Sequence, residues 1–370
     1  MTFALSSMLE GDNMAMPYRD DKGREFLQCF AAATLCSRRG SLAEQATLLR
    51  FQPGTRGFHR RYDELAQRRV ALQKSLQSQV QEYLRDCKGL TLAIFDDTPI
   101  RKMGDHFEGQ AWHFDHSAGN YYRGFTACST AVYRGGKFGV LQTQCSSENT
   151  TKLSLLNDAV ASLCQEPLAP DVFLFDAWYA LAPVLHVIEK HKKIYITKLK
   201  SNMIATFGDE NISLRTLAKS LEHEQYARIV VHDRTFWVLD LELSLKTLGT
   251  QRVLICKDEV FAEPIFLTTN SRTFSTKFVL MIYQKRFQIE VFFKDAKQYL
   301  NLSTFQCRSR RKWELHFVLL QILHWSMQRR DSISKTVRNI WNSVESATSY
   351  INKNSLFQKI IDDFSARCQT

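Results

Sequence analysis

The segment from Tyr283 to Lys297 constrains the fold most, because its polar and apolar residues separate at helical spacing. On a helix that turns by about 100° per residue, four polar side chains fall within about 60° of one another: Tyr283, Arg286, Glu290 and Lys297. The residues expected on the opposite side are apolar, namely Phe278, Ile289, Phe292, Phe293, Ala296 and Leu300. The pattern predicts a helix over residues 276–300 that buries one face and keeps one polar stripe.

Two further groups of carboxylates follow apolar segments. One predicted strand runs into Asp96 and Asp97, and a second ends at Asp176 with a helix behind it. Carboxylate oxygens are ligands that Mg²⁺ prefers, and two such ions can activate water and stabilise the leaving oxygen of a phosphodiester. Together with Glu290, these aspartates indicate a metal site for phosphodiester chemistry.

These motifs, in this order, resemble the bacterial insertion-sequence transposases of the DDE type. Within them the chain resembles the cut-and-paste group with the Tyr-x2-Arg-x3-Glu-x6-Lys signature, related to IS-four elements. The resemblance covers roughly residues 90–330. It implies an α/β fold: a ribonuclease-H-like catalytic domain with a mixed sheet, a β-strand insertion and an N-terminal helical DNA-binding region. It also implies two bound Mg²⁺ ions, for which Mn²⁺ would substitute, and makes the catalytic and metal-binding residues Asp97, Asp176 and Glu290.

The choice of Asp97 over Asp96 rests on the family's Asp-Thr pattern, because strand alternation alone does not separate the two. Each carboxylate also has an ordinary structural interpretation. Paired aspartates often end a strand in a turn, Asp176 can cap the helix that follows it, and Glu290 can pair with a cation one helical turn away. The agreement of three separated motifs favours the catalytic interpretation. One departure is Phe287, where the family usually has Trp.

The formal net charge of +11 indicates a polyanionic partner. The excess is concentrated in residues 271–330, which hold twelve Lys and Arg against three Asp and Glu. The resemblance implies that this partner is double-stranded DNA, both the terminal inverted repeats and the target. The predicted DNA contacts are Tyr283, Arg286, Lys297, Lys198, Lys200, Arg60, Arg61 and His116. Each basic cluster can equally be solvated surface charge.

A histidine-rich segment lies between the first two predicted strands. His106, His113, Asp115 and His116 resemble a metal-binding group, but no helix aligns them and a zinc site would conflict with a carboxylate triad. We instead expect His116 to contact DNA or to order its loop, as in the family. Tyr121 beside it could stack on bases, although core packing is the commoner role of such residues.

Residues 24–88 have the spacing of a helical region. Ser41 begins a capping-box match, a break follows at residues 52–56, and the next helix carries Arg60 and Arg61. Two short helices around a tight break, the second one basic, predict a DNA reader like a helix-turn-helix. The alternative is an ordinary helical bundle with a solvated arginine face.

The nine cysteines contain no Cys-x-x-Cys pair, which is typical of reduced thiols in the cytosol rather than of a disulfide framework or a zinc site. No apolar run approaches the roughly 20 residues that span a bilayer. The N-terminus also lacks a signal-peptide pattern. We therefore expect a cytoplasmic, nucleoid-associated protein without a membrane partner.

The chain is expected to contain five segments, which are a helical DNA-binding region at 1–88, the first part of the catalytic domain at 89–200, a mostly β insertion at 201–272, catalytic helices at 273–330 and a helical tail at 331–370. The predicted strands are 91–97, 123–133, 138–145, 171–176, 194–199, 227–233, 235–242, 251–257 and 264–269. The predicted helices within these segments are 151–164, 178–191, 213–222, 276–300 and 311–329.

The predicted function is a DNA transposase that binds the ends of its element, cleaves them and joins them to target DNA as a homodimer in the synaptic complex. One alternative is a domesticated or decayed protein that binds specific DNA without transposition. Another is a metal-dependent DNA nuclease that cuts without joining. Inverted repeats around the gene, with a short direct duplication outside them, would favour the mobile element over both alternatives.

Overall fold

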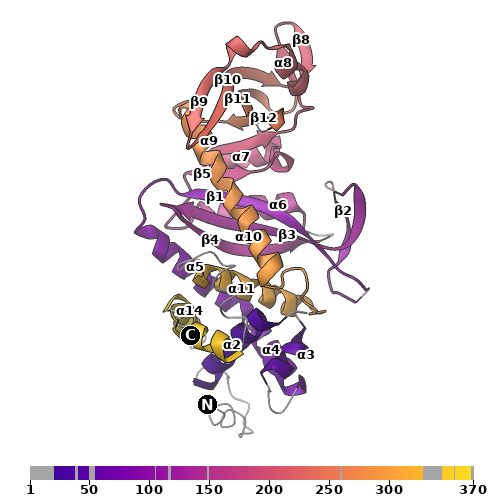
Figure 1. Cartoon of the computed structure of the whole chain (residues 1–370), viewed down its shortest axis with the longest axis vertical. Helices are drawn as coiled ribbons and strands as arrows, with labels where there is room; N and C mark the ends of the chain where they lie inside the picture. Colours follow the sequence, from indigo (N-terminus) through magenta and orange to yellow (C-terminus); the bar gives the residue numbers. More distant parts are fainter. Residues whose placement is uncertain are drawn as a thin grey trace.

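The computed structural model describes residues 21–37, 41–49, 55–104, 106–115, 118–147, 150–258, 261–327, 344–353 and 355–367. Figure 1 shows an elongated molecule with helices at its base, a sheet in its middle and the strands of the predicted insertion at its top. The first and last described helices both lie in the base.

The base is a single helical unit. It comprises α2 (Asp21–Cys36), α3 (Leu42–Leu48), α4 (Thr55–Gln67), α5 (Arg69–Arg85), α11 (Arg310–Met327), α13 (Val344–Lys353) and α14 (Ser355–Arg367). Its centre is α11, which is buried around its whole circumference from Leu315 to Met327 and packs against α4, α5 and α14. A helix that is apolar on every side needs neighbours on every side. The N-terminal region and the C-terminal tail therefore fold together, as α13 on α2 and α14 on α5 show.

The central sheet is mixed, as the sequence predicts. Its strands are β1 (Leu92–Arg101), β2 (Ala111–Asp115), β3 (Asn120–Arg134), β4 (Lys137–Ser146), β5 (Val172–Phe175) and β6 (Ile194–Leu199). Strand β1 pairs antiparallel with β3 and parallel with β5, and β5 pairs parallel with β6. The first half of β1 and all of β5 are buried apolar residues, as strands covered on both faces require.

The predicted insertion extends this sheet instead of standing apart from it. Its elements are β7 (Ile204–Phe207), β8 (Glu210–Ser213), α8 (Leu214–Ser220), η2 (His223–Gln225), β9 (Ala227–Val231), β10 (Arg234–Leu245), β11 (Gly249–Asp258) and β12 (Phe261–Thr269). Strand β12 pairs antiparallel with β6, so the described strands form one sheet in the order β2-β3-β1-β5-β6-β12-β11-β10-β7-β8, with β4 paired to β3 and β9 paired to β10. The sequence did not predict β2, β7 or β8, which are too short for alternation to show.

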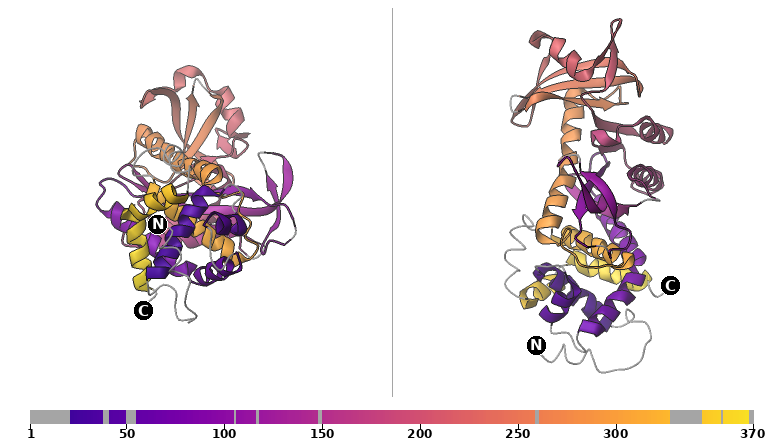
Figure 2. Two further views of the ribbon diagram at one scale, coloured as in Figure 1. Left: turned by 60° about the horizontal axis from the view of Figure 1, so that its bottom comes forward. Right: turned by 90° about the vertical axis from the view of Figure 1, so that its right-hand side faces the viewer.

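Helices cover both faces of the central sheet (Figure 2). One face carries α6 (Lys152–Leu163), η1 (Ala177–Tyr179) and α7 (Ala182–Lys190). The other carries α9 (Thr276–Tyr283), η3 (Gln284–Arg286) and α10 (Phe287–Tyr299).

Two predicted helices need correction. The predicted α-helix at 178–191 begins at Ala182, where Pro183 suits the first turn of a helix. The predicted helix over 276–300 contains a 3₁₀ turn at Gln284–Arg286, a tighter geometry that often marks a functional position within a helix.

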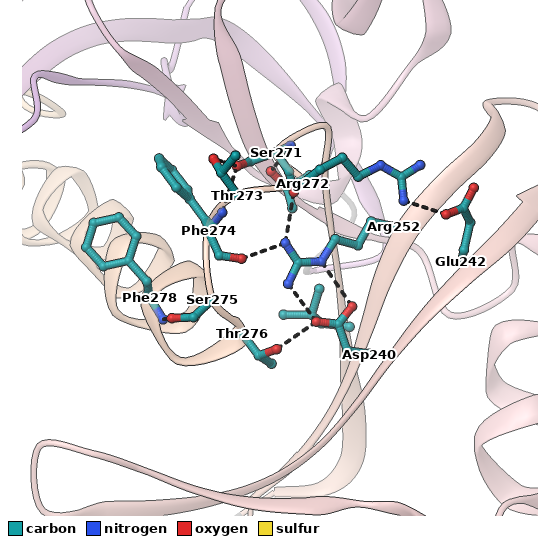
Figure 3. A network of polar contacts seen from close by, with 12 residues as sticks. Asp240, Glu242, Arg252, Ser271, Arg272, Thr273, Phe274, Ser275, Thr276 and Phe278 are labelled. Atoms are coloured by element: carbon teal, nitrogen blue, oxygen red, sulfur yellow. Dashed lines mark hydrogen bonds and ion pairs between the residues drawn. The ribbon is translucent and has the colours of Figure 1, made fainter.

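The helix pair α9–α10 is anchored to the insertion by Arg252 (Figure 3). The guanidinium forms two hydrogen bonds with Asp240, with N···O distances of 3.0 and 2.7 Å, and donates to the carbonyls of Ser271 and Phe274 at 2.8 and 2.7 Å. Thr276, the first residue of α9, donates to the same carboxylate at 2.7 Å. One arginine thus joins two strands of the insertion to the start of α9.

No helix in the described part of the chain is long and apolar enough to cross a membrane.

Candidate active site

Asp96 and Asp97 point to opposite faces of the sheet, because successive residues of a strand alternate. The Asp96 carboxylate accepts a hydrogen bond from Arg286 Nη1 at 2.8 Å, on the face covered by α10. The Asp97 carboxylate accepts hydrogen bonds from Lys152 Nζ at 3.1 Å and from the Tyr179 hydroxyl, on the face covered by α6. Asp96 thus faces the polar stripe and Asp97 faces α6, while the assignment of Asp97 as a metal ligand stays a prediction.

Arg286 joins two of the carboxylates. Its Nη1 contacts Asp96, and its Nη2 forms an ion pair with Glu290 one turn further along the helix. The Arg286 and Asp96 side chains are only 15% and 17% exposed, whereas Glu290 is 41% exposed. Glu290 therefore forms the ion pair with a cation one helical turn away that an ordinary helix face predicts. The same cation, Arg286, also contacts Asp96 on β1.

Asp176 follows β5 and occupies the N-cap position of η1. Its side chain makes no capping hydrogen bond, so Asp176 has the position of a helix cap but does not act as one. It follows Phe175, whose carbonyl accepts a hydrogen bond from Tyr283, on the strand next to β1. Asp96 and Glu290 thus both contact Arg286, and Asp176 lies after the end of the neighbouring strand.

Burial dominates the electrostatics of the Asp96 carboxylate. It raises the pKa of Asp96 to about 7, with smaller contributions from the charges of Asp97 and Asp176. The positive charge of Arg286 and the Asp97 N–H group act in the opposite direction. Burial alone would lower the pKa of Arg286, but Tyr283 and the acidic neighbours raise it. A cation bound beside Asp96 would favour its charged form.

The remaining members of the polar stripe are partly covered. The Tyr283 ring lies beside Arg286, with the guanidinium carbon 5.8 Å from the ring centre, and its hydroxyl donates to the Phe175 carbonyl at 3.5 Å. Lys297 is half-buried near Asp115, and burial lowers its pKa while Asp115 acts to raise it. The predicted DNA contacts of Tyr283 and Lys297 stay predictions.

The other predicted DNA contacts come from two parts of the described chain, the helical base and the end of β6. Arg60 is exposed on α4 in the helical base, and Arg61 beside it pairs with Glu64 at 3.3 Å. Lys198 and Lys200 lie at the end of β6, near the insertion. His116 lies outside the described residues.

A pocket of about 490 Å³ lies between the Asp176 turn and the insertion. Its lining includes Ala177, Lys200, Met203 and Lys246. Lys200 therefore lines a cavity next to the carboxylate cluster, which the sequence alone did not indicate.

The described residues include no group of three or more His, Cys, Asp and Glu side chains placed to hold a metal ion. The donor chemistry nevertheless fits a divalent cation, because the Asp96 and Glu290 carboxylates meet at one guanidinium and Asp176 follows the strand next to β1. Oxygen ligands of this type suit Mg²⁺ or Mn²⁺. His113 and Asp115 belong to β2, where His113 Nδ1 lies 3.2 Å from the Thr126 hydroxyl and Asp115 pairs with Arg101 at 2.9 Å.

Sequence reasoning passed over Asp96, and it missed Lys152 and Tyr179 altogether. Strand alternation separates Asp96 from Asp97 only once the position of α10 is known. Lys152 and Tyr179 carry no motif, and only the folded sheet brings them to Asp97.

No curated protein matches this chain. A family model described as the transposase DDE domain matches residues 88–326, well over half of the 370 residues. The match includes both aspartates of β1, the Asp176 turn and the whole of α10. Transposases of this family are enzymes that act on DNA and use divalent metals. The chain belongs to the transposase DDE domain family.

Proposed function

We propose that this protein is a cut-and-paste transposase of the group with the Tyr-Arg-Glu-Lys signature, which cleaves the ends of its element and joins them to target DNA. The observation that carries this proposal is the bridge formed by Arg286 between Asp96 and Glu290, beside Asp176. On a helix face exposed only to solvent, Arg286 would not contact Asp96 on the central strand β1.

Asp96, Asp176 and Glu290 would hold two Mg²⁺ ions, for which Mn²⁺ would substitute. When bound, such ions make a hydroxide nucleophile available near neutral pH and compensate charge on the phosphate. Arg286 balances the carboxylates in the described structure, and it is placed to pair with a phosphate oxygen when DNA enters. Lys297, further along the same helix, would hold the neighbouring phosphate as a point charge.

The first carboxylate of the triad is assigned to Asp96 in place of Asp97. Asp97 already accepts hydrogen bonds from Lys152 and Tyr179 on the other face of the sheet. The family's Asp-Thr pattern favours Asp97, whereas the contact with Arg286 favours Asp96. The two assignments predict different responses to substitution.

DNA outside the active site would be held by other parts of the chain. The proposal assigns recognition of terminal repeats to the N-terminal helices with Arg60 and Arg61, and backbone contacts to Lys198 and Lys200. Basic side chains on these elements support phosphate contacts, which position a duplex without reading its sequence. Two copies of the chain would synapse two element ends, and His116 would contact DNA near the cut.

The proposal is tested by cleavage of labelled duplexes taken from both flanks of the gene, with Mg²⁺ present. The variants Asp96→Ala, Asp176→Ala and Glu290→Ala should each lose cleavage by at least a hundredfold while gel-shift affinity persists. Asp295→Ala is the matched control, since it removes another half-buried carboxylate of α10 and should cut normally.

The products distinguish this proposal from its alternatives. A wild-type protein that shifts the flanking DNA but never cuts it would indicate a decayed, binding-only copy. Cutting without any joined product would indicate a nuclease. Unimpaired cutting by the Asp176 or Glu290 variant would remove that residue from the site.

A further inference from the structure

The backbone pairing between β1 and β5 ends before it reaches the carboxylates. The last paired residues of these parallel strands are Ile94 and Leu174, two positions before Asp96 and Asp176. On its other side, β1 stays paired with β3, where Asp96 lies opposite Ser129. Strand β5 stays paired with β6 as far as Phe175. The spacing between the two aspartates is therefore not set by main-chain hydrogen bonds between their own strands.

One side chain spans this gap. Tyr179 belongs to the η1 turn that Asp176 begins, and its N–H donates to the Asp176 carbonyl at 3.0 Å. Its buried ring meets Phe95 edge to face, with ring centres 5.0 Å apart, and its hydroxyl donates to Asp97. Tyr179 thus contacts both chain neighbours of Asp96 from the turn that carries Asp176.

A second side chain completes the contact from α6. Lys152 Nζ lies 3.1 Å from the Asp97 carboxylate and 3.8 Å from the centre of the Trp178 ring. Lys152 and Asp97 are both mostly buried, with side chains 21% and 17% exposed. Asp97 on β1 therefore contacts both the η1 turn and α6. Its negative charge is balanced by Lys152 without a metal ion.

We propose that Asp97 is a positioning residue. Through Tyr179 and Lys152, its carboxylate fixes the turn that carries Asp176 at the spacing from Asp96 that metal binding needs. Asp97 holds no metal ion itself. This inference rests on the proposed function and concerns how the spacing between Asp96 and Asp176 in the same site is maintained.

The chemistry of the contact predicts a specific pattern of metal binding. Asp97→Asn removes the negative charge that both the Tyr179 hydroxyl and Lys152 contact, so it weakens both contacts at once. Tyr179→Phe keeps the ring against Phe95 and removes only the hydroxyl. Partners that orient metal ligands typically contribute about tenfold to hundredfold in metal affinity. Each variant should therefore weaken binding without abolishing an ion site.

The test is Mn²⁺ titration of the full chain bound to flanking duplex, followed by electron paramagnetic resonance of free Mn²⁺. Asp97→Asn and Tyr179→Phe should each weaken Mn²⁺ binding about tenfold while the number of bound ions at saturation stays unchanged. The double variant should be no weaker than the weaker single variant, since both changes break one contact. Asp96→Asn should lose an ion.

Tyr195→Phe is the matched control, because it removes another buried tyrosine hydroxyl, bonded to Gln251 at 2.7 Å, on β6. It should leave Mn²⁺ binding unchanged. Loss of an ion in Asp97→Asn would make Asp97 a ligand and overturn the inference. Unchanged affinity in Asp97→Asn, or losses that multiply in the double variant, would overturn it as well. A wild type that neither binds Mn²⁺ nor cuts would instead refute the proposed function itself.

Discussion

Arg286, the last residue of η3, is the residue through which the polar stripe contacts the sheet. One end of its guanidinium contacts Asp96 on β1 and the other contacts Glu290 on α10. The planar fork of arginine can hold two carboxylates at once, whereas the ammonium of lysine acts as a single point charge. The identity of this cation, and not only its charge, should therefore matter.

Arg286→Lys should slow DNA cleavage at least tenfold at saturating DNA, because lysine cannot bridge Asp96 and Glu290 or later grip a phosphate with two bonds. Single-turnover cleavage of a labelled end measures this directly. Arg272→Lys is the control, since Arg272 pairs with Glu242 at the surface of the insertion. A wild-type rate in Arg286→Lys would mean that charge alone suffices.

The sequence predicted Glu290, Asp176 and the stripe around them, because helical spacing and strand ends are local patterns. It could not choose between Asp96 and Asp97, because that choice depends on which face of β1 receives α10. The position of Tyr121 also depends on distant parts of the chain. Core packing is the commoner role of such a residue, but the Tyr121 side chain is 70% exposed. Long-range packing decides both cases.

At the scale of single elements, α11 holds two buried histidines. Burial lowers the pKa of His316 to about 4 and that of His324 to about 3. A histidine in the unfolded chain titrates near 6.5. Below that pH the unfolded chain binds more protons than the folded chain, so the free energy of unfolding falls as the pH falls.

Acidification from pH 7 to pH 5 should therefore cost on the order of 2 kcal/mol of stability for each buried histidine. Urea unfolding at the two pH values measures the loss. His324→Leu should lose less stability on acidification than the wild type, whereas the exposed His186→Leu should behave like the wild type. Equal pH dependence in the wild type and His324→Leu would contradict a neutral buried histidine.

The joint between the insertion and α9 depends on Arg252. Its contact with Asp240 is half-buried, and although burial would raise the pKa of Asp240, hydrogen bonds from Arg252 and Thr276 lower it. Removing the arginine leaves two carbonyls without this donor and leaves Thr276 as the hydrogen-bond donor to Asp240.

Arg252→Met should lower the free energy of unfolding by about 2 kcal/mol or more. It should also expose the 271–276 segment to protease, which limited proteolysis with mass spectrometry can map. Arg272→Met, which breaks a neighbouring surface ion pair, serves as the control and should change cleavage of this segment little. Identical digestion of both variants would contradict the role of Arg252 as the anchor.

At the scale of the whole molecule, the ends of the chain form one unit. Asn301 donates to the Thr34 and Ser37 carbonyls at 3.0 Å, and Tyr62 donates to the Lys312 carbonyl at 3.1 Å. Helices α13 and α14 of the C-terminal segment also pack against α2 and α5, while the predicted segment boundaries themselves stay predictions. The boundaries were predicted from composition and spacing, which do not reveal that α11 is surrounded by helices from both ends.

Recognition of element ends is accordingly best tested by point substitutions, because removal of residues 1–88 would expose the apolar surface of α11. Arg60→Ala with Arg61→Ala should reduce the preference for flanking DNA over random DNA by about tenfold. Lys359→Ala, on an exposed position of α14, is the control in a competition gel shift. Unchanged preference in the arginine variant would place the reader elsewhere.

The central claim is that Asp96, and not Asp97, joins Asp176 and Glu290 in holding the metals. A thiolate is a softer ligand than a carboxylate and disfavours Mg²⁺ more than Mn²⁺. The most direct measurement is the ratio of cleavage rates in Mn²⁺ and Mg²⁺ for Asp96→Cys and Asp97→Cys. The account predicts a ratio at least tenfold above that of the wild type for Asp96→Cys only. An increased ratio for Asp97→Cys, with none for Asp96→Cys, would contradict it.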